Sequence, residues 1–153
     1  MIDVEIEDPA WTTAEPQAER LARAAADAVL KHERQPGGAT VLLTDDATVQ
    51  DLNLRFRQQD KPTNVLSFPT TPNPERHLGD VALAYATCAR EAAQQGKPLA
   101  AHLQHLVAHG VLHLLGYDHM TDEEAHEMEG LERVVLASLG VPDPYAAGEG
   151  DHG

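Results

Sequence analysis

The chain contains the stretch His109-Gly110-Val111-Leu112-His113-Leu114-Leu115-Gly116-Tyr117-Asp118-His119. His109 and His113 are four residues apart, so on a helix their imidazoles lie one turn apart on the same face. Gly116 can end that helix in the left-handed conformation, which turns the chain back and lets His119 supply a third nitrogen. Three neutral imidazoles with a fourth position open are the arrangement of a catalytic zinc site, whereas structural sites are usually closed by four ligands. The stretch therefore predicts one zinc ion (Zn2+) per chain, held by His109, His113 and His119.

The residue after the first histidine limits the class of enzyme. The spacing matches the zincin signature H-E-x-x-H-x-x-G-x-x-H at every position but one, because Gly110 stands where the signature has glutamate. That glutamate is the general base of a metallopeptidase. The pattern therefore favours a metal-dependent hydrolase of another kind, and a metallopeptidase is the less favoured alternative.

His102 and His105 lie on the same stripe of the expected helix as His109 and His113. His105 and His109 are also four residues apart, but only the pair His109 and His113 places a third histidine just beyond the helix end. Two alternatives stay open for His102 and His105, which either line the cleft or pack as polar residues under the sheet. Asp118 either accepts an imidazole N–H from its neighbour His119 or has a helix-capping or solvent role.

The charge and composition exclude several function classes. A net charge of −14, from 25 acidic and 11 basic residues, argues against broad nonspecific nucleic-acid binding but leaves room for a local positive groove. Six aromatic residues (one Trp, three Tyr, two Phe) do not predict a base-stacking platform. Cys88 is the one cysteine, which fits a reducing compartment. Residues 1–5 lack the pattern of a signal peptide, and no apolar run reaches the ~20 residues of a membrane span, so we expect a cytoplasmic protein without a membrane partner.

The hydrophobic periodicity predicts an α+β fold, in which a small mixed β-sheet of about four strands packs with about five helices around a zincin-like three-histidine metal site. We expect residues 1–145 to form a single domain and residues 146–153 to be a flexible C-terminal tail. The expected strands are residues 2–6, 40–44, 65–68 and 79–84, and the expected helices are residues 14–32, 47–56, 85–95, 99–115 and 122–139.

Two of these helices carry local signals. Thr121 and Glu124 have the spacing of a capping box before the last helix. In the helix of residues 47–56 the apolar spacing places Val49, Leu52 and Phe56 on the face that should turn toward the core.

A second informative stretch runs from Asn53 to Pro69 and combines arginines with amide side chains before a strand. On its own such a stretch usually means solvated surface. Beside a metal site, however, an arginine suits phosphate chemistry, because its guanidinium donates two parallel hydrogen bonds to one anion.

The two stretches resemble the YbeY family of rRNA maturation factors and endoribonucleases. The similarity covers the motif H-G-x-L-H-L-x-G-Y-D-H from His109 to His119, the block from Asn53 to Pro69, the strand from Leu78 to Val81, and the acidic helix from Thr121 to Glu132. The chain departs from the pattern at His126, where an acidic residue is more typical. The resemblance implies a metal-dependent endoribonuclease specific for single strands, acting in ribosomal RNA processing (maturation of the 16S rRNA 3′ end) and in ribosome quality control.

The resemblance also implies residue roles and partners. His109, His113 and His119 are implied as zinc ligands, and Arg57 and His113 as catalytic residues. The implied partners are single-stranded or ribosomal RNA, the small ribosomal subunit, and a ribosomal protein or an assembly GTPase. A binding alternative stays open, namely a ribosome-assembly factor with a structural zinc, whose acidic surface contacts basic partners.

The mechanism follows only in outline from these residues. As a hypothesis, the metal lowers the pKa of a water or polarises a phosphate oxygen, and Arg57 stabilises the extra charge that develops on the phosphate. The sequence identifies no general base, and it leaves the nucleophile open between water and the RNA 2′-hydroxyl.

Overall fold

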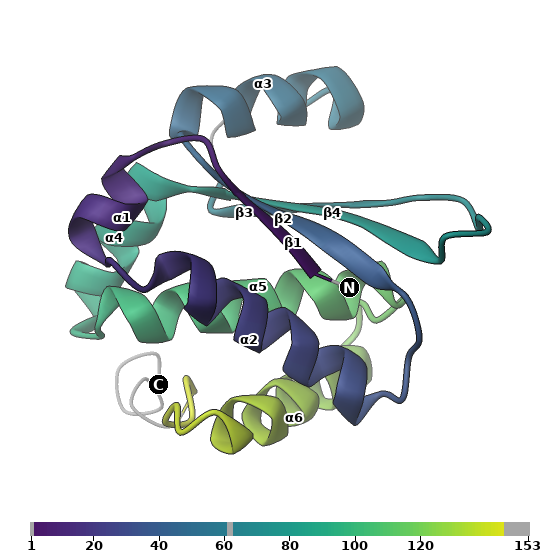
Figure 1. Cartoon of the computed structure of the whole chain (residues 1–153). Helices are drawn as coiled ribbons and strands as arrows, with labels where there is room; N and C mark the ends of the chain where they lie inside the picture. The colour runs from purple at the N-terminus through teal and green to yellow at the C-terminus, as the bar shows by residue number, and fades with distance from the viewer. Residues whose placement is uncertain (1, 61–62, 146–153) are drawn as a thin grey trace.

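The computed structural model describes residues 2–60 and 63–145 (Figure 1). Four strands form one mixed sheet in the order β1-β2-β4-β3, in which β1, β2 and β4 are parallel and β3 is antiparallel to β4. The predicted α+β class with a mixed four-stranded sheet is thereby confirmed. In chain order the elements are β1 (Ile2–Ile6), α1 (Ala10–Ala14), α2 (Ala18–His32), β2 (Gly38–Thr44), α3 (Asp46–Arg57), β3 (Val65–Pro69), β4 (His77–Ala84), α4 (Tyr85–Gln95), α5 (Leu99–Leu114) and α6 (Asp122–Ser138).

β4 is an interior strand, paired with β2 on one side and β3 on the other. Val81 stands opposite Val41 of β2 and opposite Ser67 of β3. A strand that is covered on both faces reads as a nearly continuous apolar run, and the run Val81-Ala82-Leu83-Ala84 is buried throughout. This strand is the surface on which the histidine helix rests.

The two faces of the sheet are covered unequally (Figure 1). α2 and α5 lie beneath one face, with α6 packed against α5, whereas α3 lies alone on the other face. The main core lies between the sheet and α5, where Leu103, Val107, Val111 and Leu112 are buried. Full burial of such a side chain stabilises the fold by about 1.5–3 kcal/mol. Because α5 is enclosed by the sheet and α6, much of its histidine stripe faces protein.

α3 begins and ends with clear local signals. The Asp45 side chain accepts a hydrogen bond from the backbone N–H of Thr48 at 2.7 Å and caps the helix, and Gln58 ends it in the left-handed conformation at φ 57°. Val49 is buried as predicted. The prediction that Phe56 faces the core is wrong, since its side chain is 65% exposed and touches Phe68 edge-on. Phe56 lies near the C-terminal end of α3 and lines a surface pocket together with Leu42, Leu52 and Phe68.

The N-terminal helical region is divided where the sequence predicted one helix over residues 14–32. α1 ends at Ala14, and α2 begins at Ala18. Glu15 is extended, with φ −141° and ψ 96°, because the ring of the following Pro16 disfavours helical geometry at the residue before it. α1 is therefore a helix beyond the about five expected, and it buries Trp11 against the main core.

The C-terminal part begins with the predicted capping box. Thr121 accepts from the backbone N–H of Glu124, and the Glu124 side chain accepts from the backbone N–H of Thr121. After α6 the chain passes back toward the start of α5, where Lys97 donates to the carbonyl of Pro144 at 2.8 Å. The expected Gly-rich tail, residues 146–153, lies outside the described residues.

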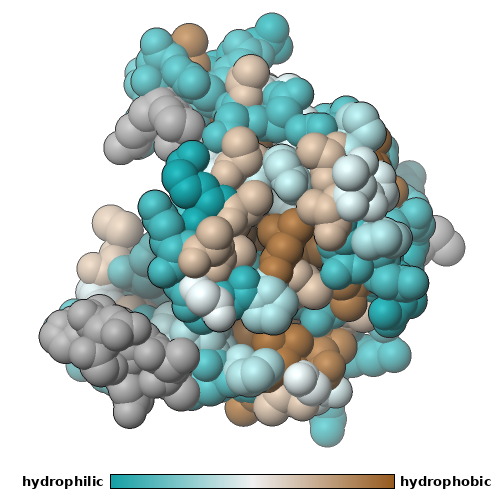
Figure 2. Space-filling model, turned by 90° about the vertical axis from the view of Figure 1, so that its left-hand side faces the viewer, coloured by the Kyte–Doolittle hydropathy of each residue, from teal (hydrophilic) through white to brown (hydrophobic). Residues whose placement is uncertain are grey.

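The surface on the side of α1 and α4 is shown in Figure 2. Polar side chains predominate at its edges, and apolar residues gather toward its middle. Within the described part of the chain, no helix combines the length and the apolar character needed to span a bilayer.

Candidate metal centre

Three histidines meet where α5 ends. The rings of His109 and His113 lie one turn apart with centroids 4.6 Å from each other. Gly116 follows in the left-handed conformation at φ +100°, so the chain reverses as predicted. The His119 ring then lies with its centroid 5.4 Å from that of His109 and 5.0 Å from that of His113. One ring nitrogen of each histidine lies within 4.8 Å of the other two, so the group could hold a metal ion.

Hydrogen bonds orient two of these rings toward one point. Nδ1 of His109 lies 2.8 Å from Oε2 of Glu132, and Nδ1 of His113 lies 2.9 Å from the carbonyl oxygen of Tyr117. The carboxylate of Glu132 and the carbonyl of Tyr117 can only accept a hydrogen bond. Each Nδ1 is therefore the donor, and each Nε2 keeps a lone pair. A metal ligand whose other nitrogen donates to a carboxylate or carbonyl is the usual form of histidine in metal sites.

The distance between the two lone pairs tests whether a metal fits. Nε2 of His109 and Nε2 of His113 are 3.1 Å apart. Two nitrogens bound to one tetrahedral zinc at ~2.0–2.1 Å each lie about 3.3 Å apart. Two lone pairs pointed at each other at this distance repel unless a cation lies between them. Three imidazole donors suit zinc and the other late first-row metals, so the residues present fit the predicted ion.

The electrostatics keep the ring of His113 neutral. Burial lowers the pKa of His113, and the neighbouring His109 and His119 lower it further. Glu132 behaves in the opposite sense to an ordinary buried acid. Burial alone would raise its pKa, but hydrogen bonds from His105 and His109 outweigh burial and lower the pKa to about 2. An ionised carboxylate thus stands behind the imidazole of His109.

Gly110 occupies the place of the zincin glutamate for a packing reason. A Cβ atom at this position would lie 2.5 Å from Cγ1 of Val81 and 3.2 Å from Oγ of Ser67. Ser67 also donates its hydroxyl to the carbonyl of Gly110 at 2.9 Å, which ties the helix to β3. The backbone of α5 therefore rests directly on the sheet, and a glutamate side chain has no room there.

A cleft of about 950 Å³ opens at the histidines. Arg57, predicted as a loop residue near the site, is the last residue of α3 and lines this cleft together with all three histidines. Its guanidinium donates to the carbonyl of Ser67 at 2.7 Å and lies 5.9 Å from the ring centroid of Phe68. The remaining polar lining is made of amide, hydroxyl and carboxylate side chains, namely Asn53, Gln59, Thr63, Asn64, Ser67 and Asp118.

The structure decides between the alternatives for the other two histidines of the stripe. His102 is buried and its Nε2 lies 2.9 Å from Oε1 of Glu91 on α4. His105 has its Nε2 2.8 Å from Oε1 of Glu132 on α6. Neither is among the described residues that line the cleft, so both are packed polar residues.

Asp118 does not hydrogen-bond to the ring of His119, and the residue that caps the following helix is Thr121. Oδ1 of Asp118 accepts the backbone N–H of His119 at 2.8 Å but lies 3.8 Å from Nδ1 of the same residue, too far for a hydrogen bond to the ring. Glu132 is the acid that contacts a candidate ligand, His109. The sequence analysis identifies Glu132 only as part of an acidic helix. The signal for it was present, because Glu132 shares the spacing of the buried Met128, Val135 and Leu136 on α6, and an acid on an apolar face needs partners.

Comparison with known proteins gives close relatives along nearly the whole chain. Residues 3–140 match the family model described as Endoribonuclease YbeY. The chain is 55% identical over 155 residues to an Endoribonuclease YbeY of Paramagnetospirillum magneticum, with 94% of each chain covered. It is 50% identical over 153 residues to that of Azorhizobium caulinodans, covering 95% of this chain and 96% of the other. The fold is similar to the solution structure of TM1509 from Thermotoga maritima, with a TM-score of 0.61, 22% identity, and 100% and 99% of the two chains covered.

Proposed function

This chain belongs to the YbeY endoribonuclease family, and from that premise we propose that it is a zinc-dependent endoribonuclease that cleaves single-stranded RNA. The observation that supports the proposal most is the shared cleft, since Arg57 and the three histidines line one opening. A metal that is held by three ligands in an open cleft keeps a coordination position for substrate, which distinguishes it from a structural zinc closed by four ligands.

His109, His113 and His119 are proposed as the ligands of one zinc ion per chain. When bound, zinc would supply Lewis-acid polarisation of a phosphate oxygen or of a water. The protein then has two tasks, which are to keep His113 neutral through burial and to direct the Nε2 atoms of the ligands to one point. The Glu132 carboxylate and the Tyr117 carbonyl serve the second task for His109 and His113. His113 enters catalysis in this sense, as a ligand.

Arg57 is proposed to bind the phosphate that is cleaved. One of its N–H groups donates to the carbonyl of Ser67, which holds the guanidinium at the cleft wall. A guanidinium carries five N–H donors, so a phosphate oxygen pair can take others in a bidentate contact. As negative charge builds up on the phosphate in the transition state, a fixed cation at this place stabilises it. Asn53 and Asn64 line the same cleft beside Arg57.

The cellular role is proposed from family membership. We infer processing of ribosomal RNA in the cytoplasm, with maturation of the 16S rRNA 3′ end and ribosome quality control as the specific tasks. The small ribosomal subunit, with a ribosomal protein or an assembly GTPase, is the proposed partner. The net charge of −14 supports contact with basic ribosomal proteins. An acidic surface repels RNA, so RNA has to bind through local contacts in the cleft.

A comparison of RNA substrates tests the activity. Zinc-loaded protein should cleave a single-stranded oligoribonucleotide and leave intact the same strand annealed to its complement. The deoxy form of the strand distinguishes the nucleophiles, because a route through the 2′-hydroxyl fails on DNA whereas attack by water does not require that group. Failure of the zinc-loaded chain to cleave any RNA strand, with zinc bound and the fold intact, would leave the assembly-factor alternative in its place.

A further inference from the structure

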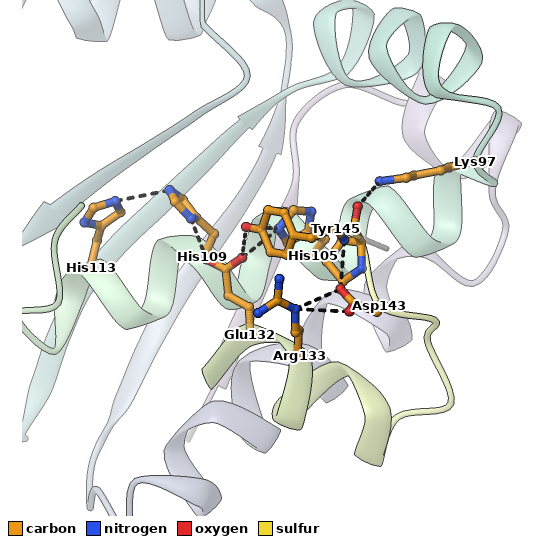
Figure 3. A network of polar contacts seen from close by, with 9 residues as sticks. Lys97, His105, His109, His113, Glu132, Arg133, Asp143 and Tyr145 are labelled. Carbon is orange, nitrogen blue, oxygen red and sulfur yellow. Dashed lines mark hydrogen bonds and ion pairs between the residues drawn. The ribbon is translucent and has the colours of Figure 1, made fainter. Parts of the chain in front are cut away.

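Glu132 is the centre of a polar network that reaches from the candidate metal centre to the last described residues of the chain (Figure 3). Its Oε2 accepts from Nδ1 of His109 at 2.8 Å, and its Oε1 accepts from Nε2 of His105 at 2.8 Å. The hydroxyl of Tyr145 also donates to Oε1. One carboxylate therefore binds side chains from α5 and from the segment that follows α6.

The burial of this carboxylate shows that it is built into the site. The side chain of Glu132 is 1% exposed, and among the described residues it accepts hydrogen bonds from two imidazoles and one hydroxyl. Burying a charged group is costly unless charge and hydrogen bonds compensate for it. The hydrogen bonds are present, and a divalent cation on the far side of the His109 ring would supply the opposite charge.

The bond to His109 acts on the nitrogen that faces the cleft. With its proton held at Nδ1 by Glu132, the ring has its lone pair at Nε2, directed toward Nε2 of His113 at 3.1 Å. Donation to a carboxylate also makes the other ring nitrogen a better electron donor to a metal. Glu132 thus fixes both the direction and the basicity of one ligand.

The segment after α6 holds Glu132 in turn. The Tyr145 hydroxyl lies 3.2 Å from Nε2 of His105 in addition to its bond with Glu132, and its ring packs edge-on against the His105 ring at 5.4 Å. Arg133 lies over the Tyr145 ring at 5.1 Å and forms an ion pair with Asp143 at 3.0 Å. These contacts fasten Tyr145 from two sides, so that its hydroxyl stays on the carboxylate (Figure 3).

We propose that Glu132 and Tyr145 are positioning residues for the metal ligand His109, and that the segment from Asp143 to Tyr145 thereby sets the affinity of the metal centre. The proposal rests on the ligand set given under the proposed function, and it adds that the end of the described chain is part of the site. The proposal predicts that a substitution at Tyr145 lowers metal affinity, although Tyr145 does not line the cleft.

The first test substitutes Glu132→Gln in the full chain, with Glu127→Gln as the matched control because Glu127 is an exposed acid on the same helix. A glutamine side chain has one acceptor oxygen, so either His109 or the pair His105 and Tyr145 loses its acceptor. Zinc affinity, measured by competition with a chromogenic chelator, should fall about 10- to 100-fold in Glu132→Gln and stay unchanged in the control. The visible spectrum of the cobalt-substituted protein should shift as well, since the ligand field changes.

The second test substitutes Tyr145→Phe, which removes only the hydroxyl, with Tyr85→Phe as its control on α4. Tyr145→Phe should lower zinc affinity in the same direction as Glu132→Gln but by less, while Tyr85→Phe should bind zinc as the wild type does. Wild-type affinity and an unaltered cobalt spectrum in Tyr145→Phe and in any folded Glu132→Gln protein would overturn the proposal. If Glu132→Gln does not fold, Tyr145→Phe decides alone. Because these readouts need no RNA, a chain that binds zinc tightly but cleaves nothing disproves the proposed function and not this inference.

Discussion

Nε2 of His109 and Nε2 of His113 lie 3.1 Å apart, each on a ring whose Nδ1 is hydrogen-bonded to an acceptor. The two rings therefore present lone pairs to a common point at the mouth of the cleft. Zinc ligation through both atoms requires a separation of about 3.3 Å, so little movement of the rings is needed on binding. Pre-formed ligands are consistent with tight binding, because little ordering entropy remains to be lost.

Removing one ligand should release the metal. We expect wild-type protein to contain one zinc per chain and His113→Ala to lose it, because two imidazoles and solvent bind zinc much more weakly than three. Elemental analysis after dialysis measures this. His126→Ala is the control, since His126 is an exposed histidine on α6. Full zinc retention in single alanine variants of all three histidines would contradict the ligand set.

Zinc binding should weaken as the pH falls. The pKa of His113 lies below its usual value because of burial and of the neighbouring His109 and His119, so this ring is neutral at pH 7 and available to a metal. As the pH falls through that lowered pKa, protons compete for Nε2. The unfolded chain binds the proton at higher pH than the folded chain, so the stability of metal-free protein also falls below about pH 6.5.

Chelator competition between about pH 7.5 and pH 5 measures the effect on affinity, and melting of metal-free protein measures the effect on stability. An apparent zinc affinity that is constant over this range would argue against ligation by three imidazoles.

Two helix glycines should respond to alanine with opposite signs. At Gly110 a Cβ would lie 2.5 Å from Cγ1 of Val81, so Gly110→Ala should destabilise the protein by about 1–3 kcal/mol. At Gly130 on α6 no atom beyond the adjacent backbone of the helix lies within 4 Å of the added Cβ, so Gly130→Ala should stabilise it by about 1 kcal/mol. Urea denaturation measures both. A Gly110→Ala protein as stable as the wild type would mean that α5 does not rest on β4 as described.

Arg57 should matter for turnover more than for folding. Its side chain is exposed and donates a hydrogen bond to the carbonyl of Ser67 rather than packing in the core, so Arg57→Ala should keep its zinc and nearly its melting temperature. RNA cleavage should fall by more than about tenfold, and Arg57→Lys should recover only part of it, because lysine cannot make a bidentate contact. Arg55→Ala is the control, since Arg55 pairs with Asp51 on the exposed face of the same helix. If Arg57→Ala cleaves RNA at the wild-type rate, the proposal that Arg57 binds the phosphate is wrong.

The sequence predicts those parts of the site that depend on local spacing. The helical pair His109 and His113 and the turn at Gly116 follow from residues at most seven positions apart, and helix geometry alone brings them together. Glu132 lies 23 residues from His109, and only the packing of α6 on α5 brings its carboxylate to that ring. Phe56 shows the converse limit, because its apolar spacing indicates an inward face whereas its side chain stays 65% exposed beside Phe68.

The dependence of RNA cleavage on zinc occupancy tests the central claim most directly. Metal-free protein is titrated with zinc, and the initial rate on a single-stranded oligoribonucleotide is measured at each step beside the bound zinc per chain. We predict no cleavage without metal and a rate that rises in proportion to occupancy and levels off at one zinc per chain. A metal-free protein that cleaves as fast as the zinc-loaded one, or a fully loaded protein that leaves RNA intact, would contradict the account.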